Sequence, residues 1–194
     1  MTQLDPNPRP IFQALDRTAV APYPRSWYVR RALWGMVWRT IFRIPRAWGL
    51  RRSLLRAFGA KIADRVIIYP DAKIFHPWLF EIGYNSSLAE GVVIYNLGPV
   101  TVGAHTVISQ GSYVCAGTHD FTRPELPLLR PPITIGAGVW IAAQAFIGPD
   151  VTVGDNSIVG ARAVVTKDVP PGMIVAGNPA RVIRPRPMND EPSP

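Results

Sequence analysis

The chain has 194 residues, of which 47% are hydrophobic and 18% are charged, and its formal net charge is +8 at pH 7. A chain of this length and polarity has room for one compact domain but not for two large ones. Its single cysteine excludes an intramolecular disulfide, and its first residues lack the basic and then apolar stretches of a secretion signal. We therefore expect a cytoplasmic protein.

The positive charge is concentrated near the N-terminus. Residues 17–63 contain ten Arg, one Lys and no acidic residue, whereas the rest of the chain carries 10 basic and 13 acidic residues. The basic character therefore belongs to one segment, and no nucleic-acid partner is expected for the protein as a whole. Residues 1–22, which precede most of this segment, are expected to be disordered or extended.

Residues 23–60 are predicted to form a basic, aromatic helical segment. Trp34, Trp38, Ile41 and Phe42 fall on one face of a first helix. The longest stretch without charge is far shorter than the roughly 20 residues that a membrane-spanning helix needs. The segment is therefore not expected to cross a membrane.

Pro45 should end or kink the first helix, and a second helix is expected from about residue 49 to 58. Two interpretations of this helical segment stay open. It could lie on an anionic membrane and bring the protein to lipid-linked material. Alternatively, the two helices could cover the open end of the following domain, with their arginine stems over apolar surface.

From residue 62 onward, aliphatic residues recur with a period of six in five triplets. Within a triplet the spacing is always six, and between triplets it is eight, eight, twenty-one and six. A helix cannot keep a period of six on one face, and a flat strand would carry its glycines inside the ladder, where they weaken it. The fifteen positions are Ile62, Ile68, Ile74, Ile82, Leu88, Ile94, Val102, Ile108, Val114, Ile135, Ile141, Ile147, Val153, Val159 and Val165.

A three-sided coil satisfies this pattern, with one short strand and one corner for each six residues. The aliphatic residue would point inward, and the small or β-branched residue two positions earlier would fit inside the same narrow prism. Stacked coils would pair their backbones about 4.8 Å apart and leave edges only at the two ends. A glycine directly after the aliphatic residue is expected to supply unusual corner torsions. These glycines are Gly83, Gly103, Gly136, Gly148, Gly154 and Gly160.

The repeat is interrupted between Val114 and Ile135, where about fifteen residues must leave the coil as a loop. Its four prolines prevent a regular strand or helix, and a long proline-rich loop in a compact domain usually has a function. His119 stands at the start of this loop, and a neutral imidazole suits a general base at neutral pH. From the spacing alone, a surface histidine without a role is equally consistent.

The loop and the coils after it resemble the hexapeptide-repeat acyltransferases, over residues 60–185. The matching text is Thr118-His119-Asp120, then PITIGAGVW and VWIAAQAFIGPDVTVGDNSIVGARAVVTKDVPPGMIVAGNPARVIR. The chain is most similar to the colanic-acid or exopolysaccharide group and to the maltose and galactoside O-acetyltransferases. The resemblance implies an all-β solenoid, a left-handed parallel β-helix of about five coils over residues 61–185. The helical segment would precede it, the loop would leave after the third coil, and residues 186–194 would form a flexible tail.

The family further implies an O-acetyltransferase that moves acetyl from acetyl-CoA to a sugar hydroxyl, in exopolysaccharide or capsule synthesis. The acceptor would be a saccharide or a lipid-linked saccharide. His119 would be the base, and a homotrimer would form each site from two subunits. By residue-wise match, the remaining roles are backbone contacts to pantetheine from Ala143 and Ala161, contacts along the coenzyme from Thr166 and Lys167, phosphate binding by Arg181 and Arg184, and an acyl-tunnel wall from Trp140.

Some positions depart from the family or suggest other chemistry. The galactoside enzymes have an acceptor-binding Asn where this chain has Ala89 and Glu90, so Asn96 is the nearest candidate for acceptor binding. His76 and His105 lack the paired spacing of the zinc-dependent relatives, and no metal is expected. Cys115 could be imagined as an acyl carrier, but direct transfer is preferred. Transfer to an amino group of a nucleotide-linked sugar and a non-catalytic scaffold remain alternative functions.

Overall fold

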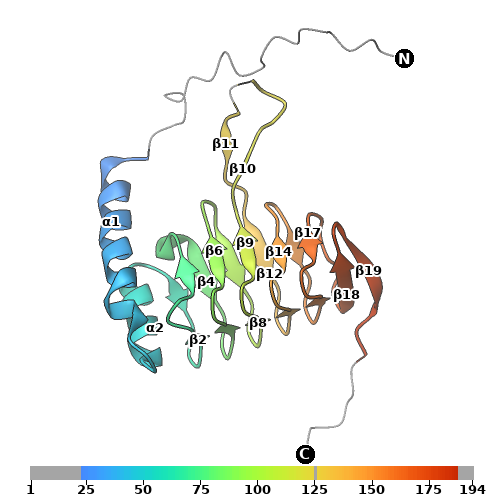
Figure 1. The fold of residues 1–194 in the computed structure, drawn as a ribbon, viewed down its shortest axis with the longest axis horizontal. Helices are drawn as coiled ribbons and strands as arrows, with labels where there is room; N and C mark the ends of the chain where they lie inside the picture. Colours follow the sequence, from blue (N-terminus) through green and yellow to red (C-terminus); the bar gives the residue numbers. More distant parts are fainter. Residues whose placement is uncertain (1–22, 125, 188–194) are drawn as a thin grey trace, which may run out of the picture.

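The computed structural model describes residues 23–124 and 126–187, so the predicted N-terminal extension and the tail beyond residue 187 lie outside the described part. Two helices, α1 (Arg25–Arg39) and α2 (Trp48–Ala57), precede a long parallel β-solenoid, and a short 3-10 turn at Ile41–Arg43 joins them. Figure 1 shows both helices at one end of the solenoid and a hairpin projecting from its middle.

The solenoid has three faces, each a sheet to which successive coils contribute parallel strands. Face A contains β1 (Lys61–Ile62), β4 (Phe80–Ile82), β7 (Val100–Val102), β12 (Ile133–Ile135) and β15 (Thr152–Val153). Face B contains β2 (Ile67–Ile68), β5 (Ser87–Leu88), β8 (Val107–Ile108), β13 (Trp140–Ile141), β16 (Ile158–Val159), β18 (Met173–Gly177) and β19 (Ala180–Pro185). Face C contains β3 (Lys73–Ile74), β6 (Val93–Tyr95), β9 (Tyr113–Cys115), β14 (Phe146–Ile147) and β17 (Val164–Val165), and a 3-10 turn at Pro77–Leu79 joins faces C and A of the first two coils.

The predicted core is confirmed. Ile62 is 6% exposed and each of the other fourteen aliphatic positions is at most 1% exposed. The small residues two positions earlier are buried as well, including the hydroxyls of Ser86, Thr106 and Ser112. These hydroxyls donate to backbone carbonyls of the next coil, as Ser86 Oγ does to Gly103 O at 2.8 Å, so the narrow prism holds polar side chains without leaving them unpaired.

The solenoid has about six turns, one more than the five predicted. After the fifteenth position the spacing shortens, so a search for sextets misses the last turn. Val169 bridges Val153 on face A, and β18 pairs in parallel with β16 on face B. Strand β19 then folds back antiparallel on β18 and covers the edge of the last coil.

The predicted role of the glycines after the aliphatic positions is wrong. Their φ angles are not positive; the left-handed torsions occur instead on the third residue after an aliphatic position, for example at Asn85 (φ 55°) and Gly111 (φ 68°). The glycines are needed for close stacking, because a Cβ on Gly83 would lie 2.5 Å from Ala104 N and one on Gly154 would lie 2.5 Å from Pro171 N. They let successive coils touch backbone to backbone.

The helical segment covers the first coil by hydrogen bonding as well as by packing. Between coils, the backbone N–H of one residue donates to a carbonyl of the next coil, as Ala63 N does to Ile82 O. The first coil has no coil before it, so the corresponding five carbonyls would be unpaired. Side chains of α1 and α2 donate to all five: Arg56 to Ile62 O, Arg52 to Val66 O, Arg51 to Ile68 O, Trp38 to Ala72 O and Trp34 to Ile74 O.

This pairing favours the capping interpretation for these five side chains. Of the four residues predicted on one helical face, Trp34 and Phe42 are buried and Trp38 is partly buried, but Ile41 is 45% exposed. Ile41 turns away because the first helix ends at Arg39 and the chain continues as a 3-10 turn. Among the described residues, no helix combines the length and hydropathy needed to cross a bilayer.

Candidate functional site

The interruption of the repeat forms a hairpin that leaves the solenoid between faces C and A (Figure 1). Its two short strands, β10 (Thr118–His119) and β11 (Leu128–Leu129), pair antiparallel, with His119 opposite Leu128. The prediction placed a loop here without strands of its own. The prolines prevent long strands, but two residues on each side suffice for a ladder.

His119 is exposed, and one of its ring nitrogens is engaged in a hydrogen bond. Nδ1 lies 2.6 Å from the carbonyl oxygen of Leu126, which can only accept, so Nδ1 carries the proton in the neutral ring. Nε2 is then the basic nitrogen. Leu126 has φ 47°, a left-handed torsion that a leucine adopts at a cost of about 1–2 kcal/mol, and the hairpin therefore holds this carbonyl in an unfavourable backbone geometry beside the imidazole.

The neighbours of His119 do not add a second catalytic group. Asp120 accepts from the Thr122 hydroxyl at 2.5 Å and from its N–H at 3.0 Å, and these two bonds lower the pKa of the Asp120 carboxyl. The carboxylate thus shapes the hairpin turn. Burial raises the pKa of the Cys115 thiol, whose Sγ lies 3.4 Å from Gly117 O. A raised pKa favours the protonated thiol, which is a weaker nucleophile than the thiolate.

The residues predicted to hold the coenzyme lie at the C-terminal half of the solenoid. Lys167 and Arg181 line one cavity of about 270 Å³, together with Val165, Val169 and Val182. Arg184 lies opposite Ile174 in the last ladder and is exposed, as is Thr166. The structure therefore brings Lys167 and Arg181 together and leaves Thr166 and Arg184 beside them on the same end.

Ala143 and Ala161 occupy equivalent corners of two successive coils, since Arg162 N donates to Ala143 O at 2.9 Å. Within residues 23–124 and 126–187, no hydrogen bond is found to the backbone N–H of either alanine. Both corners lie between faces B and C. In contrast, the hairpin that carries His119 starts at the edge between faces C and A, and Lys167 lies at the same edge. The predicted contacts therefore flank face C on both sides.

Trp140 stands on face B and is 47% exposed, with its Nε1 donating to Ser109 Oγ at 3.0 Å. Its indole is held by the neighbouring coil and does not fill the core. In a single chain it does not enclose a tunnel, so the predicted acyl-tunnel wall would need another surface opposite it.

Comparison with known proteins identifies the family. Residues 132–167 match the family model described as bacterial transferase hexapeptide (six repeats). A putative colanic acid biosynthesis acetyltransferase, WcaF of Escherichia coli, is 43% identical over 162 residues, which cover 81% of this chain and 88% of that protein. The chain belongs to the hexapeptide-repeat acetyltransferases.

Two further members of the hexapeptide-repeat acetyltransferases extend the comparison. The galactoside O-acetyltransferase of E. coli is 34% identical over 137 residues, covering 69% of this chain and 68% of that one. The solved structure of a hexapeptide-repeat acetyltransferase from Vibrio cholerae, complexed with acetyl coenzyme A, has a TM-score of 0.76 and 26% identity and covers 84% of this chain and 91% of that chain.

Asn96, the candidate acceptor ligand of this hexapeptide-repeat acetyltransferase, is fully buried. Its Nδ2 donates to His76 O at 2.6 Å and its Oδ1 accepts from His76 N at 2.9 Å. Both ends of the amide thus hold the backbone of the preceding coil. The acceptor-binding prediction therefore has no free amide to support it, because the sequence cannot tell whether an Asn faces inward or outward at a corner.

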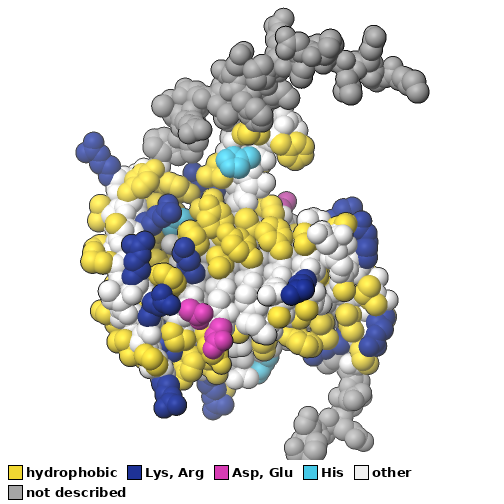
Figure 2. Space-filling model, viewed as in Figure 1, with side chains coloured by type: hydrophobic (Ala, Val, Ile, Leu, Met, Phe, Trp, Pro, Cys, Tyr) yellow, Lys and Arg dark blue, Asp and Glu magenta, His cyan; other side chains and the backbone are white. Residues whose placement is uncertain are grey.

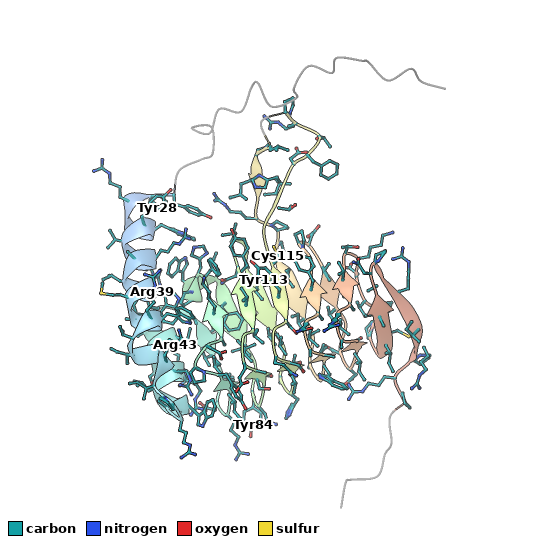
Figure 3. All side chains as sticks on the ribbon, viewed as in Figure 1. Tyr28, Arg39, Arg43, Tyr84, Tyr113 and Cys115 are labelled. Atoms are coloured by element: carbon teal, nitrogen blue, oxygen red, sulfur yellow. The ribbon has the colours of Figure 1, made fainter. Side chains whose placement is uncertain are left out.

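Two features of this family member were missed from sequence. The first is the aromatic ladder outside face C, where Phe75, Tyr95, Tyr113 and Phe146 lie ring beside ring at 4.7–6.1 Å (Figure 3 labels Tyr113). Figure 2 shows hydrophobic side chains gathered below the base of the hairpin. These residues directly precede or follow aliphatic positions, and that spacing could have revealed them.

The second missed feature is a cluster of half-buried aromatic rings around the buried His76. Trp27 and Trp78 lie with ring centroids 5.2 Å from the imidazole, and Tyr23 stacks on Trp27 at 4.6 Å. Nowhere in the described residues do three or more His, Cys, Asp or Glu side chains converge so that they could hold a metal ion. His76 is therefore packed among aromatic rings rather than among other ligating groups.

Proposed function

We propose that this acetyltransferase moves acetyl from acetyl-CoA to a hydroxyl of a saccharide during exopolysaccharide or capsule synthesis. The colanic acid relative is named for such a pathway, and the Vibrio relative was solved with acetyl coenzyme A. The observation that carries the proposal is the bond from His119 Nδ1 to Leu126 O, which leaves Nε2 as a base at the start of the hairpin.

In this mechanism the acceptor hydroxyl attacks the thioester carbonyl while His119 Nε2 takes its proton. The tetrahedral oxyanion collapses, the C–S bond breaks, and the imidazolium returns the proton to the departing thiolate. The products are the acetyl ester and coenzyme A, and no covalent enzyme intermediate forms. Leu126 O would stabilise the imidazolium, because it accepts the Nδ1–H in both protonation states.

The coenzyme would use the groups around face C. The free N–H groups at Ala143 and Ala161 would bind the pantetheine amides, while Lys167 and Arg181, with Thr166 and Arg184 beside them, would bind the phosphates. Lys and Arg suit this role, since charge-assisted hydrogen bonds are the strong ones.

A homotrimer would complete this site. Face A is polar outside, with a row of threonines and the Lys61–Glu81 pair at 3.2 Å, whereas faces B and C carry exposed or half-buried apolar side chains such as Val107, Trp140 and Tyr113. Two different apolar faces fit a head-to-tail ring, in which one copy presents face B or its edge and the next presents face C. Trp140 and His119 would then come from different subunits.

The helical segment would also reach an anionic membrane through the surface that does not face the solenoid. Val29, Leu33 and Met36 form a stripe on α1 and are 60%, 50% and 61% exposed, with Arg25 one turn before it. Figure 2 shows basic side chains around this helix. Sedimentation with anionic vesicles should fall with added salt and with Met36→Asp, while neutral vesicles should not retain the protein.

Thiol release from acetyl-CoA, measured over a panel of saccharides and lipid-linked saccharides, tests the activity. His119→Ala should lower turnover by roughly a hundred- to ten-thousand-fold, whereas His105→Asn, at another exposed histidine, should not. Equal turnover of both variants would exclude His119 as the base.

The same assay separates the two alternative functions. If amino sugars react and acceptors that offer only hydroxyl groups do not, the reaction is N-acylation. A non-catalytic scaffold would release no thiol with any acceptor and would not be changed by His119→Ala.

A further inference from the structure

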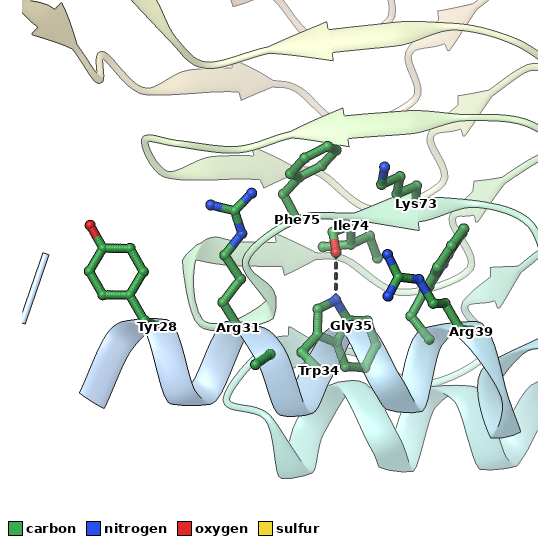
Figure 4. Close-up of a pocket in the computed structure, with 10 residues that line it drawn as sticks. Tyr28, Arg31, Trp34, Gly35, Arg39, Lys73, Ile74 and Phe75 are labelled. Atoms are coloured by element: carbon green, nitrogen blue, oxygen red, sulfur yellow. Dashed lines mark hydrogen bonds between the residues drawn. The ribbon is translucent and has the colours of Figure 1, made fainter. Parts of the chain in front are cut away.

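A cavity of about 410 Å³ opens between α1 and β3, the first strand of face C (Figure 4). Its floor is Trp34, whose Nε1 donates to Ile74 O at 2.6 Å. Aromatic side chains of Tyr28, Trp38 and Phe75 line its walls. A cavity of this size and lining is typical of sites for small organic ligands.

Three cations line the same cavity: Arg31 and Arg39 from α1 and Lys73 from β3. No acidic residue lines it, and the two ion pairs found in residues 23–124 and 126–187, Arg56–Asp64 and Lys61–Glu81, leave these three cations out. Lys73 Nζ lies 4.5 Å from the Phe75 ring centroid and 5.8 Å from that of Trp38, so aromatic faces rather than a carboxylate surround it.

Capping does not account for these charges. The arginines that close the first coil donate to its carbonyls, but Arg31 and Arg39 do not, and Figure 4 shows them directed to the cavity side of α1. All three are exposed to solvent, so an anion that enters the hollow meets three positive charges at once. A carboxylate brings one negative charge, whereas a phosphate monoester brings about 1.5 to 2 and three acceptor oxygens.

We propose that this α1–β3 cavity binds the phosphate group of a phosphorylated saccharide, which is the acceptor; this inference rests on the proposed function. The cations would bind the phosphate, and the aromatic walls would pack on the apolar faces of the sugar ring. The phosphate could be carried by a soluble sugar phosphate or by a lipid, and both present the same chemistry to the cavity.

The cavity lies on the same surface as the base of the hairpin. Strands β3, β6 and β9 are consecutive in face C, so β3 and β9 are about 10 Å apart at ordinary strand spacing. Arg130, at the return end of the hairpin, lies 4.0 Å over the Tyr23 ring, and Tyr23 stacks on Trp27, one helical turn before Arg31. The hairpin thus contacts the N-terminal end of α1, the helix that forms one side of the cavity.

Trp34 and Trp38 provide a fluorescence signal for binding without acetyl-CoA. We expect glucose 1-phosphate to quench or shift this fluorescence at concentrations at least tenfold below those of methyl glucoside. Arg39→Gln and Lys73→Gln should each weaken the binding of glucose 1-phosphate by roughly tenfold. Arg25 lies on the same helix but does not line the cavity. Arg25→Gln removes the same charge and should leave the affinity for glucose 1-phosphate within about twofold.

Two arms identify the source of the phosphate. The same sugar phosphate is offered free or as a polyprenyl ester in phosphatidylcholine vesicles, which carry no other anion. Binding of both forms supports a soluble ligand, binding of the ester alone supports a lipid-linked one, and either must be weakened by Lys73→Gln. Circular dichroism on each variant shows that the fold is retained.

Equal binding of glucose 1-phosphate and methyl glucoside, together with no retention on the ester vesicles, would overturn the inference. An equal loss of affinity for glucose 1-phosphate in Arg39→Gln and Arg25→Gln would overturn it as well. Thiol release separates this outcome from a failure of the proposed function. Acetyl transfer to neutral sugars without phosphate selectivity rejects the cavity alone, and selective phosphate binding with no thiol release for any acceptor rejects the acetyl transfer.

Discussion

The regular stacking of coils stops at the N-terminal end of the solenoid and is broken again at the hairpin. These two interruptions treat their polar groups in opposite ways. At the N-terminal end, five side chains of α1 and α2 donate to the five carbonyls that a preceding coil would have paired. In the hairpin after β9, the imidazole of His119 is exposed, and only Nδ1 is engaged by a backbone carbonyl. The first interruption is closed and the second leaves a basic nitrogen open.

This difference separates residues that hold the fold from residues available for chemistry. The many arginines of the helical segment suggest a ligand when they are read as a charge pattern, yet Arg51, Arg52 and Arg56 complete the solenoid. A lone histidine suggests little by itself, yet it lies where the chain leaves the regular coil. Variants at the first interruption should change stability, and variants in the hairpin should change turnover.

The largest effect on stability is expected for Arg51→Ala. Arg51 is 0% exposed, and its guanidinium donates to Ile68 O and Ile44 O at 2.6 Å each and to Phe42 O at 3.3 Å. Removing it leaves buried carbonyls unpaired and a cavity beside Trp48, which should lower the free energy of unfolding by about 3 kcal/mol or more. Urea denaturation followed by circular dichroism measures this loss.

The matched comparison for Arg51→Ala is His119→Ala, which should stay within about 0.5 kcal/mol of the parent because that ring is exposed. Arg51→Lys should recover little of the loss, since one ammonium cannot reach three carbonyls as a planar guanidinium does. Equal unfolding midpoints for Arg51→Ala and His119→Ala would break the contrast between the two interruptions.

A smaller loss is expected when the close contact between interior coils is disturbed. A Cβ on Gly103 would lie 2.5 Å from Gly136 C and 2.6 Å from Gly136 O, both backbone atoms of the next coil. Gly103→Ala should therefore cost about 1–3 kcal/mol, as overpacking does. Gly160→Ala is the control, because its nearest neighbour is a Cβ at 3.0 Å, and its smaller cost in the same urea experiment would show that backbone crowding sets the size of the effect.

Much of the solenoid could be predicted, because one inward residue in six is a strong and repeated signal. The strands, the core and the position of the hairpin follow from that spacing alone. The last turn was missed because it begins four residues after Val165 instead of six, at Val169. The corner glycines were explained by torsion when stacking requires them, since a single coil considered alone has no neighbour to crowd it.

The candidate site could be predicted only in part, because the sequence does not show which residues of neighbouring coils pack together. The roles predicted for His119 and for the coenzyme residues come from motifs shared with the family, and they stay predictions. Asn96 and His76 are 20 residues apart, one coil, and the sequence does not show that the amide of one holds the backbone of the other. The α1–β3 cavity likewise arises between two elements that no motif connects.

The buried His76 predicts that the stability of the protein depends on pH. Burial lowers the pKa of this imidazole, nearby Arg31 and Arg130 lower it further, and the hydrogen bond to Asn96 opposes them. Below pH 6.5 the unfolded chain protonates its histidine while the native one stays neutral, so the unfolded state binds more protons. Stability should therefore be lost as the pH falls from 6.5 toward the lower native pKa.

Urea midpoints at pH 7.5 and 5.5 test this sign. His76→Asn should be less stable than the parent at pH 7.5 but should lose less on acidification, by about 1 kcal/mol. His105→Asn, at an exposed histidine, should keep the parent dependence. If the parent gained stability on acidification, His76 would be protonated in the native protein.

The smallest expected effect is a gain in stability at a glycine of α1 that lines the α1–β3 cavity. Gly35 lies inside α1, its φ is not left-handed, and a Cβ there would meet nothing within 4 Å. Gly35→Ala should raise the free energy of unfolding by about 0.5–1 kcal/mol, because alanine restricts the unfolded chain and favours the helix. Gly49→Ala, in the first turn of α2 with equally open surroundings, should gain less, since end positions depend less on helix propensity. A loss at Gly35 would show that α1 cannot accept a side chain on its cavity side despite the open space.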